Sequence, residues 1–324
     1  MAQKPTPFQE STAIWATKKL ISRRKFVNRF LVADEVGLGK TTVAREVIKR
    51  IKKLEKEQGK PVIYVASSLD ICAQNRTKLG LDDGDLKKKV DRICLFWSKI
   101  KSRKLPPLIC LTPGTSLDIG LGRGNIDERA YMAAILYKEK RILKRKLIEV
   151  FYKPASKKNF AIKLEETLIG LRKKSLFLPK RMVAARIFKE WRLDIKWMRK
   201  RWSRHGFAKK DNEQNLARCV SRMREGMARC IVESLDPCLV ILDEFQNYRE
   251  LLGMKHGELL QPIPRGLLKP RVKTLLLSAT PFPAFVSAGD HADPGEHKGK
   301  LLGILEFLSG SDSRTDLKEP AIPI

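Results

Sequence analysis

Residues 31–44 read LVADEVGLGKTTVA, and this stretch decides how the rest of the chain is interpreted. An apolar segment, RFLVA at 29–33, runs into a loop with two glycines, and Lys-Thr-Thr then opens a helical pattern. Gly37 and Gly39 allow the backbone to curl so that its N–H groups face phosphate oxygens. The N-terminus of the following helix adds a partial positive charge. This order of strand, glycine loop and helix predicts a phosphate-binding loop.

The side chains of this loop predict ATP and Mg²⁺ as cofactors. Lys40 is placed to reach the β and γ phosphates, and the Thr41 hydroxyl is a magnesium ligand. Leu38 and Thr42 complete the set of residues that we expect to contact the nucleotide. Asp34 stands where the usual pattern has Gly or Ala.

A second motif is CLVILDEFQNY at 238–248, where an apolar strand ends in two adjacent carboxylates. We expect Asp243 to hold magnesium, mostly through water, and Glu244 to orient and polarise the attacking water. An acidic pair that merely caps a strand is the alternative. The position of the pair downstream of a phosphate loop favours the catalytic interpretation.

A third motif is TLLLSATPF at 274–282, another apolar strand followed by short hydroxyl side chains. Ser278 and Thr280 are candidates for coupling the metal site to nucleic-acid contacts. Taken alone, Ser-Ala-Thr is a weak signal.

The spacing of apolar runs predicts an α/β fold with a mostly parallel sheet. Each run is short, continuously apolar and rich in Val, Ile and Leu, as expected of strands that are buried on both faces. Helical patterns at 41–57 and 69–79 separate the first three runs, which is the alternation typical of parallel sheets. The predicted strands are 29–33, 61–66, 107–111, 238–242 and 273–277.

The charge of the chain predicts a polyanionic partner. Lys and Arg number 66 against 36 acidic residues, which gives a net charge of +30. Residues 138–229 hold 29 of the basic and nine of the acidic residues, in stretches with helical periodicity. Such a field favours nucleic acid or an anionic membrane over small neutral ligands. A solvated face or a docking surface is the alternative, and we expect Trp191, Trp197 and Trp202 mostly to pack in the core.

Other composition features bear on the expected location of the protein in the cell. No run of 18 apolar residues occurs and the N-terminus lacks a secretory pattern, so we expect no membrane segment. The six cysteines are widely spread without a CxxC pair, which argues against zinc and disulfides and favours the cytoplasm.

The composition divides the chain into four parts. We expect residues 1–124 and 236–308 to form the two parts of one ATP-binding lobe. Residues 125–235 are predicted to be a basic, mainly helical insertion, and 309–324 a tail.

Together, the three motifs in this order resemble the N-terminal lobe of superfamily 2 DExx-box helicases and translocases. The resemblance is to the Swi/Snf-like and related bacterial DEAD/DEAH-type branch, and it covers about residues 1–120 and 236–308. In that branch the loop also reads Asp-Glu-x-Gly-x-Gly-Lys-Thr, which accommodates Asp34. The resemblance implies a RecA-like P-loop fold and a motor that hydrolyses ATP. The box reads Asp-Glu-Phe-Gln at 243–246, so DNA is favoured over RNA.

The same resemblance implies further contacts. It places Gln9 where the family has an adenine-reading glutamine, although an ordinary exposed Gln is the alternative. It also implies that two loops touch the nucleic-acid backbone, and plain turn chemistry is the alternative there. The candidates in these loops are Ser67, Ser68, Thr112, Gly114 and Thr115.

The family motor also needs a second RecA-like lobe with an arginine that completes the ATP site. Only 44 residues follow Thr280, with one arginine, Arg314. A supplied arginine is worth roughly 10³–10⁵ in rate in related enzymes. We therefore expect weak turnover alone, with the second lobe on another polypeptide, unless the chain is a truncated product. A basic scaffold with a vestigial or regulatory ATP site, and a P-loop ATPase for small anions, are the alternative functions.

Overall fold

The structure is a computed structural model that describes ten stretches of the chain. These are residues 4–22, 28–35, 37–81, 90–100, 104–117, 122–204, 211–248, 266–269, 271–279 and 294–309. The chain divides into two compact units, one of residues 1–82 with 237–324 and one of residues 83–236. The second unit therefore contains the basic stretch of 125–235 and also residues 83–124.

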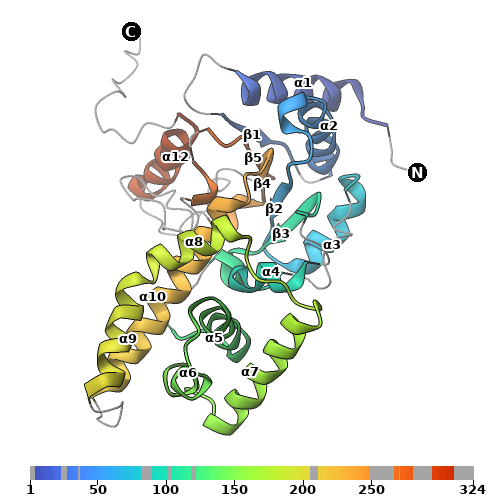
Figure 1. The fold of residues 1–324 in the computed structure, drawn as a ribbon. Helices are drawn as coiled ribbons and strands as arrows, with labels where there is room; N and C mark the ends of the chain where they lie inside the picture. The colour runs from blue at the N-terminus through green and yellow to red at the C-terminus, as the bar shows by residue number, and fades with distance from the viewer. Residues whose placement is uncertain are drawn as a thin grey trace. The chain divides into compact units, whose positions relative to one another are not determined.

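Five strands form one all-parallel sheet in the order β1-β5-β4-β2-β3 (Figure 1). Continuous apolar sequence produces strands that are buried on both faces, and every residue of β2 and β5 is buried. The predicted α/β class with a parallel sheet is confirmed, and each predicted strand is found to within about one residue. The strands are β1 (Arg29–Ala33), β2 (Val62–Val65), β3 (Leu108–Leu111), β4 (Leu239–Asp243) and β5 (Thr274–Ser278).

The described helices of the first unit are α1 (Pro7–Ile21), α2 (Lys40–Lys52), α3 (Leu69–Lys78) and α12 (Pro294–Ser309). Helix α1 begins with a capping box between Thr6 and Gln9. The helix predicted at 41–57 ends earlier than expected, because α2 stops at Lys52 and a separate 3₁₀ turn covers Glu55–Glu57.

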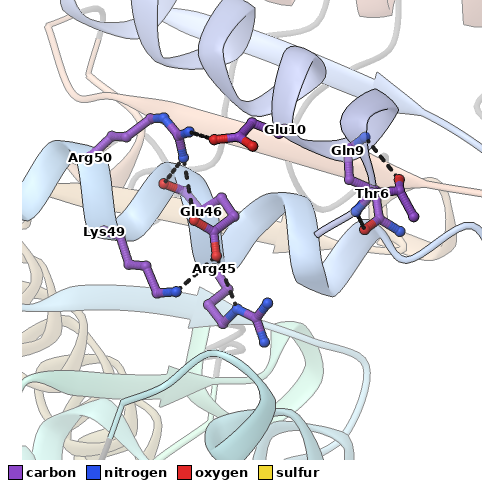
Figure 2. A network of polar contacts seen from close by, with 7 residues as sticks. All are labelled: Thr6, Gln9, Glu10, Arg45, Glu46, Lys49 and Arg50. Atoms are coloured by element: carbon purple, nitrogen blue, oxygen red, sulfur yellow. Dashed lines mark hydrogen bonds and ion pairs between the residues drawn. The ribbon is translucent and has the colours of Figure 1, made fainter. Parts of the chain in front are cut away.

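A network of charges joins α1 to α2 (Figure 2). Glu46 accepts from Lys49 at 2.8 Å, from Arg45 at 3.3 Å and from Arg50 at 3.4 Å. Arg50 also reaches Glu10 of α1 at 3.0 Å. Burial acts to raise the pKa of Glu46, but the hydrogen bonds and charges of Lys49 and Arg45 outweigh it, and its pKa lies below the usual range. This network joins the first turn of α1 to the second half of α2.

The second unit is helical between β3 and β4, as predicted for the basic stretch. Helix α9 continues from the end of α8, and the two lie along α10 (Figure 1). Trp191 is 1% exposed and belongs to the core, as expected, whereas Trp197 is half-buried and the Trp202 side chain lies outside the described residues. The main helices are α4 (Phe96–Lys99), α5 (Ile126–Lys140), α6 (Lys144–Phe151), α7 (Lys157–Arg172), α8 (Arg181–Glu190), α9 (Arg192–Arg204) and α10 (Asp211–Ser234).

Two further features are the hydropathy of the helices and the state of the cysteines. Within the stretches that the structure describes, no helix has the length and apolar character needed to cross a bilayer. All six cysteines are free thiols, and five of them are buried.

Candidate functional site

The three sequence motifs meet at one edge of the sheet. They follow β1, β4 and β5, and β5 lies between the other two strands. In the register of the sheet Ala33 is opposite Ser278, and Asp243 is opposite Leu277. Since all strands are parallel, their carboxyl ends lie together, where α/β sheets commonly bind ligands. Segments that are more than 200 residues apart in the chain therefore share one site.

The glycine loop between β1 and α2 has the backbone that its glycines predict. Gly37 and Gly39 have φ values of 90° and 83°, in the left-handed region that favours glycine. Gly39 also precedes α2 and accepts from the amides of Thr42 at 2.8 Å and Val43 at 3.1 Å. A Cβ atom at Gly39 would clash with the side-chain amide of Gln9. Only glycine therefore fits this bend.

Gln9 lies against the loop, although the two are 29 residues apart. Its Nε2 donates to the carbonyl of Leu38 at 2.9 Å, and its Oε1 accepts from the amide of Thr6 at 3.0 Å. Figure 2 shows Gln9 and Thr6 at the start of α1. Gln9 thus ties α1 to the loop, and the described contacts leave one amide hydrogen and one lone pair for a base.

Lys40 connects the loop to the acidic pair. Its Nζ lies 3.6 Å from Glu244 Oε1 and donates to the carbonyls of Asp34 at 3.1 Å and Glu35 at 3.4 Å. The Lys40 side chain is only 10% exposed, so its ammonium is held in the site. Phosphate oxygens would offer this ammonium stronger, charged acceptors than two carbonyls.

Glu244 is the centre of a second set of contacts. Its Oε2 accepts from Gln246 Nε2 at 2.6 Å and from the Ala279 amide at 3.2 Å. Gln246 Oε1 in turn accepts from the buried hydroxyl of Ser278 at 2.7 Å. A chain of polar contacts therefore runs from Lys40 to Ser278. Gln246 was not among the predicted residues; its place directly after the acidic pair was the available signal.

The backbone of Glu244 is strained. Its φ is 49°, in the left-handed region that non-glycine residues rarely adopt. Such outliers cost of order 1–3 kcal/mol and concentrate at functional sites. The outlier therefore agrees with a functional role for this carboxylate.

Asp243 lies at the end of β4 in a different network. Tyr64 of β2 donates its hydroxyl to Asp243 Oδ2, and Asn75 of α3 donates to Tyr64 at 2.8 Å and to Asp243 at 3.4 Å. Burial raises the pKa of Asp243, and the charge of Glu244 adds to this, while the Tyr64 hydrogen bond opposes it. Tyr64 and Asn75 were missed, because nothing in the sequence links them to residue 243.

The donors at this edge fit a magnesium ion and a phosphate chain. The Asp243 carboxylate and the Thr41 hydroxyl are hard oxygen ligands, which magnesium prefers. Asp34 Oδ2 is buried and has no hydrogen-bond partner within the described stretches. A Cβ atom at the loop bend of Gly39 would meet the side chains of Gln9 and Thr42, the latter in the first turn of α2. These residues would hold the metal and the phosphates.

The residues predicted to contact nucleic acid have ordinary turn and capping positions. Ser67 is exposed, and Ser68 caps α3 by accepting from the Ile71 amide at 3.2 Å. Thr112 is buried, and its hydroxyl lies 3.3 Å from that of Ser116.

Three further predicted residues are Gly114, Thr115 and Thr280. Gly114 is exposed. The side chain of Thr115 and the whole of Thr280 lie outside the described residues. The nucleic-acid contacts and the coupling role of Thr280 remain predictions.

Asp243→Asn is expected to stabilise the fold at neutral pH. The folded-state pKa of Asp243 is raised, so the folded protein favours the protonated form and its stability falls as pH rises through that pKa. Removing the charge relieves this cost at neutral pH. Urea unfolding at pH 7.5 and at pH 3 measures it: the variant should be more stable at pH 7.5, and the difference should shrink at pH 3. A variant that is less stable at pH 7.5 would contradict this account.

Comparisons of the chain with family models, with curated proteins and with solved structures give no match. The assignment of the site therefore rests on its residues and their geometry.

Proposed function

We propose that the first unit is a RecA-like, ATP-binding lobe of a superfamily 2 helicase or translocase that acts on DNA. One observation carries the proposal: Lys40 of the glycine loop lies 3.6 Å from Glu244 of the acidic pair. A chance Gly-Lys-Thr sequence after β1 and a chance Asp-Glu pair after β4 have no reason to face one another across β5. A phosphate loop opposite such a pair is the arrangement that ATP hydrolysis needs.

Each side chain has a distinct part in this proposal. Lys40 binds the phosphates, and Thr41 and Asp243 hold the magnesium ion. The ion, when bound, neutralises charge that develops on the transferred phosphoryl group. Glu244 orients the attacking water and accepts its proton. Gln246 donates to Oε2 of the Glu244 carboxylate at 2.6 Å, which leaves Oε1 as the oxygen that would accept from the water.

The net charge of the chain and the contacts at the end of β5 support nucleic acid as the substrate. The net charge of +30 favours a polyanion, and Ser278 links the end of β5 to Glu244 through Gln246. A nucleic-acid contact near this strand end would thus bear on the water-orienting carboxylate. We propose that ATP binding closes this lobe on a second lobe supplied in trans, and that hydrolysis reopens it.

The test is ATP binding and hydrolysis by the purified chain. A fluorescent ATP analogue is titrated with magnesium and with EDTA, and hydrolysis is followed with and without single-stranded DNA, duplex DNA and RNA. Magnesium-dependent binding with turnover raised by DNA supports a motor lobe. Binding without turnover supports a lobe that needs an arginine from a second lobe. Well-folded protein that neither binds nor hydrolyses ATP would overturn the proposal.

A basic nucleic-acid-binding scaffold with a vestigial ATP site is the second candidate. The pocket cations Lys140, Arg192, Lys196 and Arg199, none of which forms an ion pair within the described stretches, favour it. DNA binding without any ATP binding would select this function.

We also propose a cytoplasmic location. The six free thiols support it, because reducing compartments keep cysteines in this state.

A further inference from the structure

The second unit contains a pocket of about 400 Å³ that is lined by cations. Four of its six lining residues carry a positive charge, and none carries a negative charge. The lining residues are Lys140 of α5, Phe188 of α8, and Arg192, Ile195, Lys196 and Arg199 of α9.

The acidic residues of α8 and α9 do not neutralise these cations. Asp194 is buried in α9 and pairs with Arg222 of α10. Glu190 ends α8 and pairs with Arg229 of α10. Within the described stretches, none of the four cations of the pocket forms an ion pair. The two carboxylates of α8 and α9 are therefore directed to α10, and the charge of the pocket is left uncompensated.

A neighbouring pocket in the same unit shows the contrast. It measures about 550 Å³ and has both signs of charge in its lining. There Lys99 pairs with Asp91, and Lys163 pairs with Asp127 at 2.8 Å and with Glu166 at 3.5 Å. Its charges satisfy one another and need no ligand. An excess of lysine and arginine in the composition therefore does not by itself explain a pocket with cations only.

The cationic pocket is built on a fixed backbone. Trp191, between α8 and α9, is buried and donates its Nε1 to the carbonyl of Met223 at 2.6 Å. Its ring meets that of Phe188 edge-on, with 6.0 Å between centroids. Lys140 Nζ lies 4.3 Å from the centroid of the Phe188 ring, which holds this ammonium at the mouth of the pocket. The helices that carry the cations are thus held together before any ligand arrives.

We propose that this pocket binds successive phosphates of a nucleic-acid strand. Arg192, Lys196 and Arg199 are spaced i, i+4 and i+7, so they share one face of α9 over about 10 Å of its axis. That row is longer than one phosphate and suits a linear polyanion. The apolar residues Phe188 and Ile195 are half-buried and buried, respectively, whereas a membrane-binding face presents protruding apolar side chains. The identity of the strand as the motor's substrate rests on the proposed function.

The test compares two double variants that remove the same charge. Arg192→Ala/Lys196→Ala removes two cations of the pocket. Lys158→Ala/Lys173→Ala removes two exposed lysines of the same unit outside it. Fluorescence anisotropy measures the affinity for a labelled single-stranded oligonucleotide between 50 and 300 mM salt. We expect the pocket variant to lose about tenfold or more in affinity, and the slope of log K against log salt to fall by roughly 1.4. The control should change affinity by less than about threefold.

Three results separate the possible failures. Equal losses in both variants would mean that only overall charge matters, and would overturn the site. Loss of binding to phosphatidylserine vesicles with unchanged DNA binding would make the pocket a membrane site and overturn the proposal. Magnesium–ATP binding is measured on all three proteins and should be unchanged. If the unsubstituted chain binds DNA through the pocket but never binds ATP, the motor function fails while the pocket stands.

Discussion

Replacing Lys40 with alanine is expected to weaken magnesium–ATP binding about 10- to 100-fold and to abolish DNA-stimulated turnover. The Lys40 ammonium is 10% exposed and lies 3.6 Å from Glu244, so a phosphate chain in the loop would contact it away from bulk water. Hydrogen bonds to charged groups contribute about 1.5–3 kcal/mol each, which corresponds to this range of affinity. Titration of a fluorescent ATP analogue measures the change.

Lys49→Ala is the matched control for Lys40→Ala. Lys49 lies on the same helix, its side chain is 56% exposed, and it pairs with Glu46 rather than with the loop. Glu46 is buried but keeps its contacts with Arg45 and Arg50 when Lys49 is removed, so we expect a loss of stability of at most about 1 kcal/mol. Nucleotide binding should therefore be unchanged in Lys49→Ala. Equal losses in the two variants, or normal binding in Lys40→Ala, would contradict the assignment of the loop.

Arg224→Met is expected to destabilise the second unit by about 3–5 kcal/mol. The side chains of Arg224 and Glu128 are 3% and 2% exposed, and Arg224 Nε donates to Glu128 Oε1 at 3.2 Å. Glu128 also accepts from the Asn125 amide at 3.0 Å in the capping box of α5. Removing the guanidinium leaves a buried carboxylate without its cation. Urea unfolding followed by tryptophan fluorescence measures the loss, because Trp97 and Trp191 are buried in this unit.

Two further variants test whether burial is the cause. Arg224→Met/Glu128→Gln removes both charges and should recover part of the lost stability, since no unpaired charge then remains. Arg172→Ala breaks the exposed pair with Glu165 and should cost less than about 1 kcal/mol. If Arg172→Ala costs as much as Arg224→Met, burial of the pair is not what matters.

Local sequence determined the elements of this protein. Apolar runs such as residues 238–242 become buried parallel strands, because a strand covered on both faces has no polar side to alternate. Gly37 and Gly39 mark the tight loop between β1 and α2, since only glycine adopts positive φ at low cost. Lys40 and the acidic pair could also be predicted from local sequence. Lys40 directly follows the glycine loop, and Asp243-Glu244 directly follows an apolar strand.

Tertiary structure decided which elements meet. The placement of β5 between β1 and β4 brings Ser278 to Gln246, and the pairing of β2 with β4 brings Tyr64 to Asp243. Likewise, only the packing of α10 shows that Asp194 and Glu190 are occupied, which leaves Arg192 and Lys196 of the pocket uncompensated. Periodicity reports the burial of each element. It does not predict the order of the strands or which charges pair, because these depend on contacts between residues far apart in the chain.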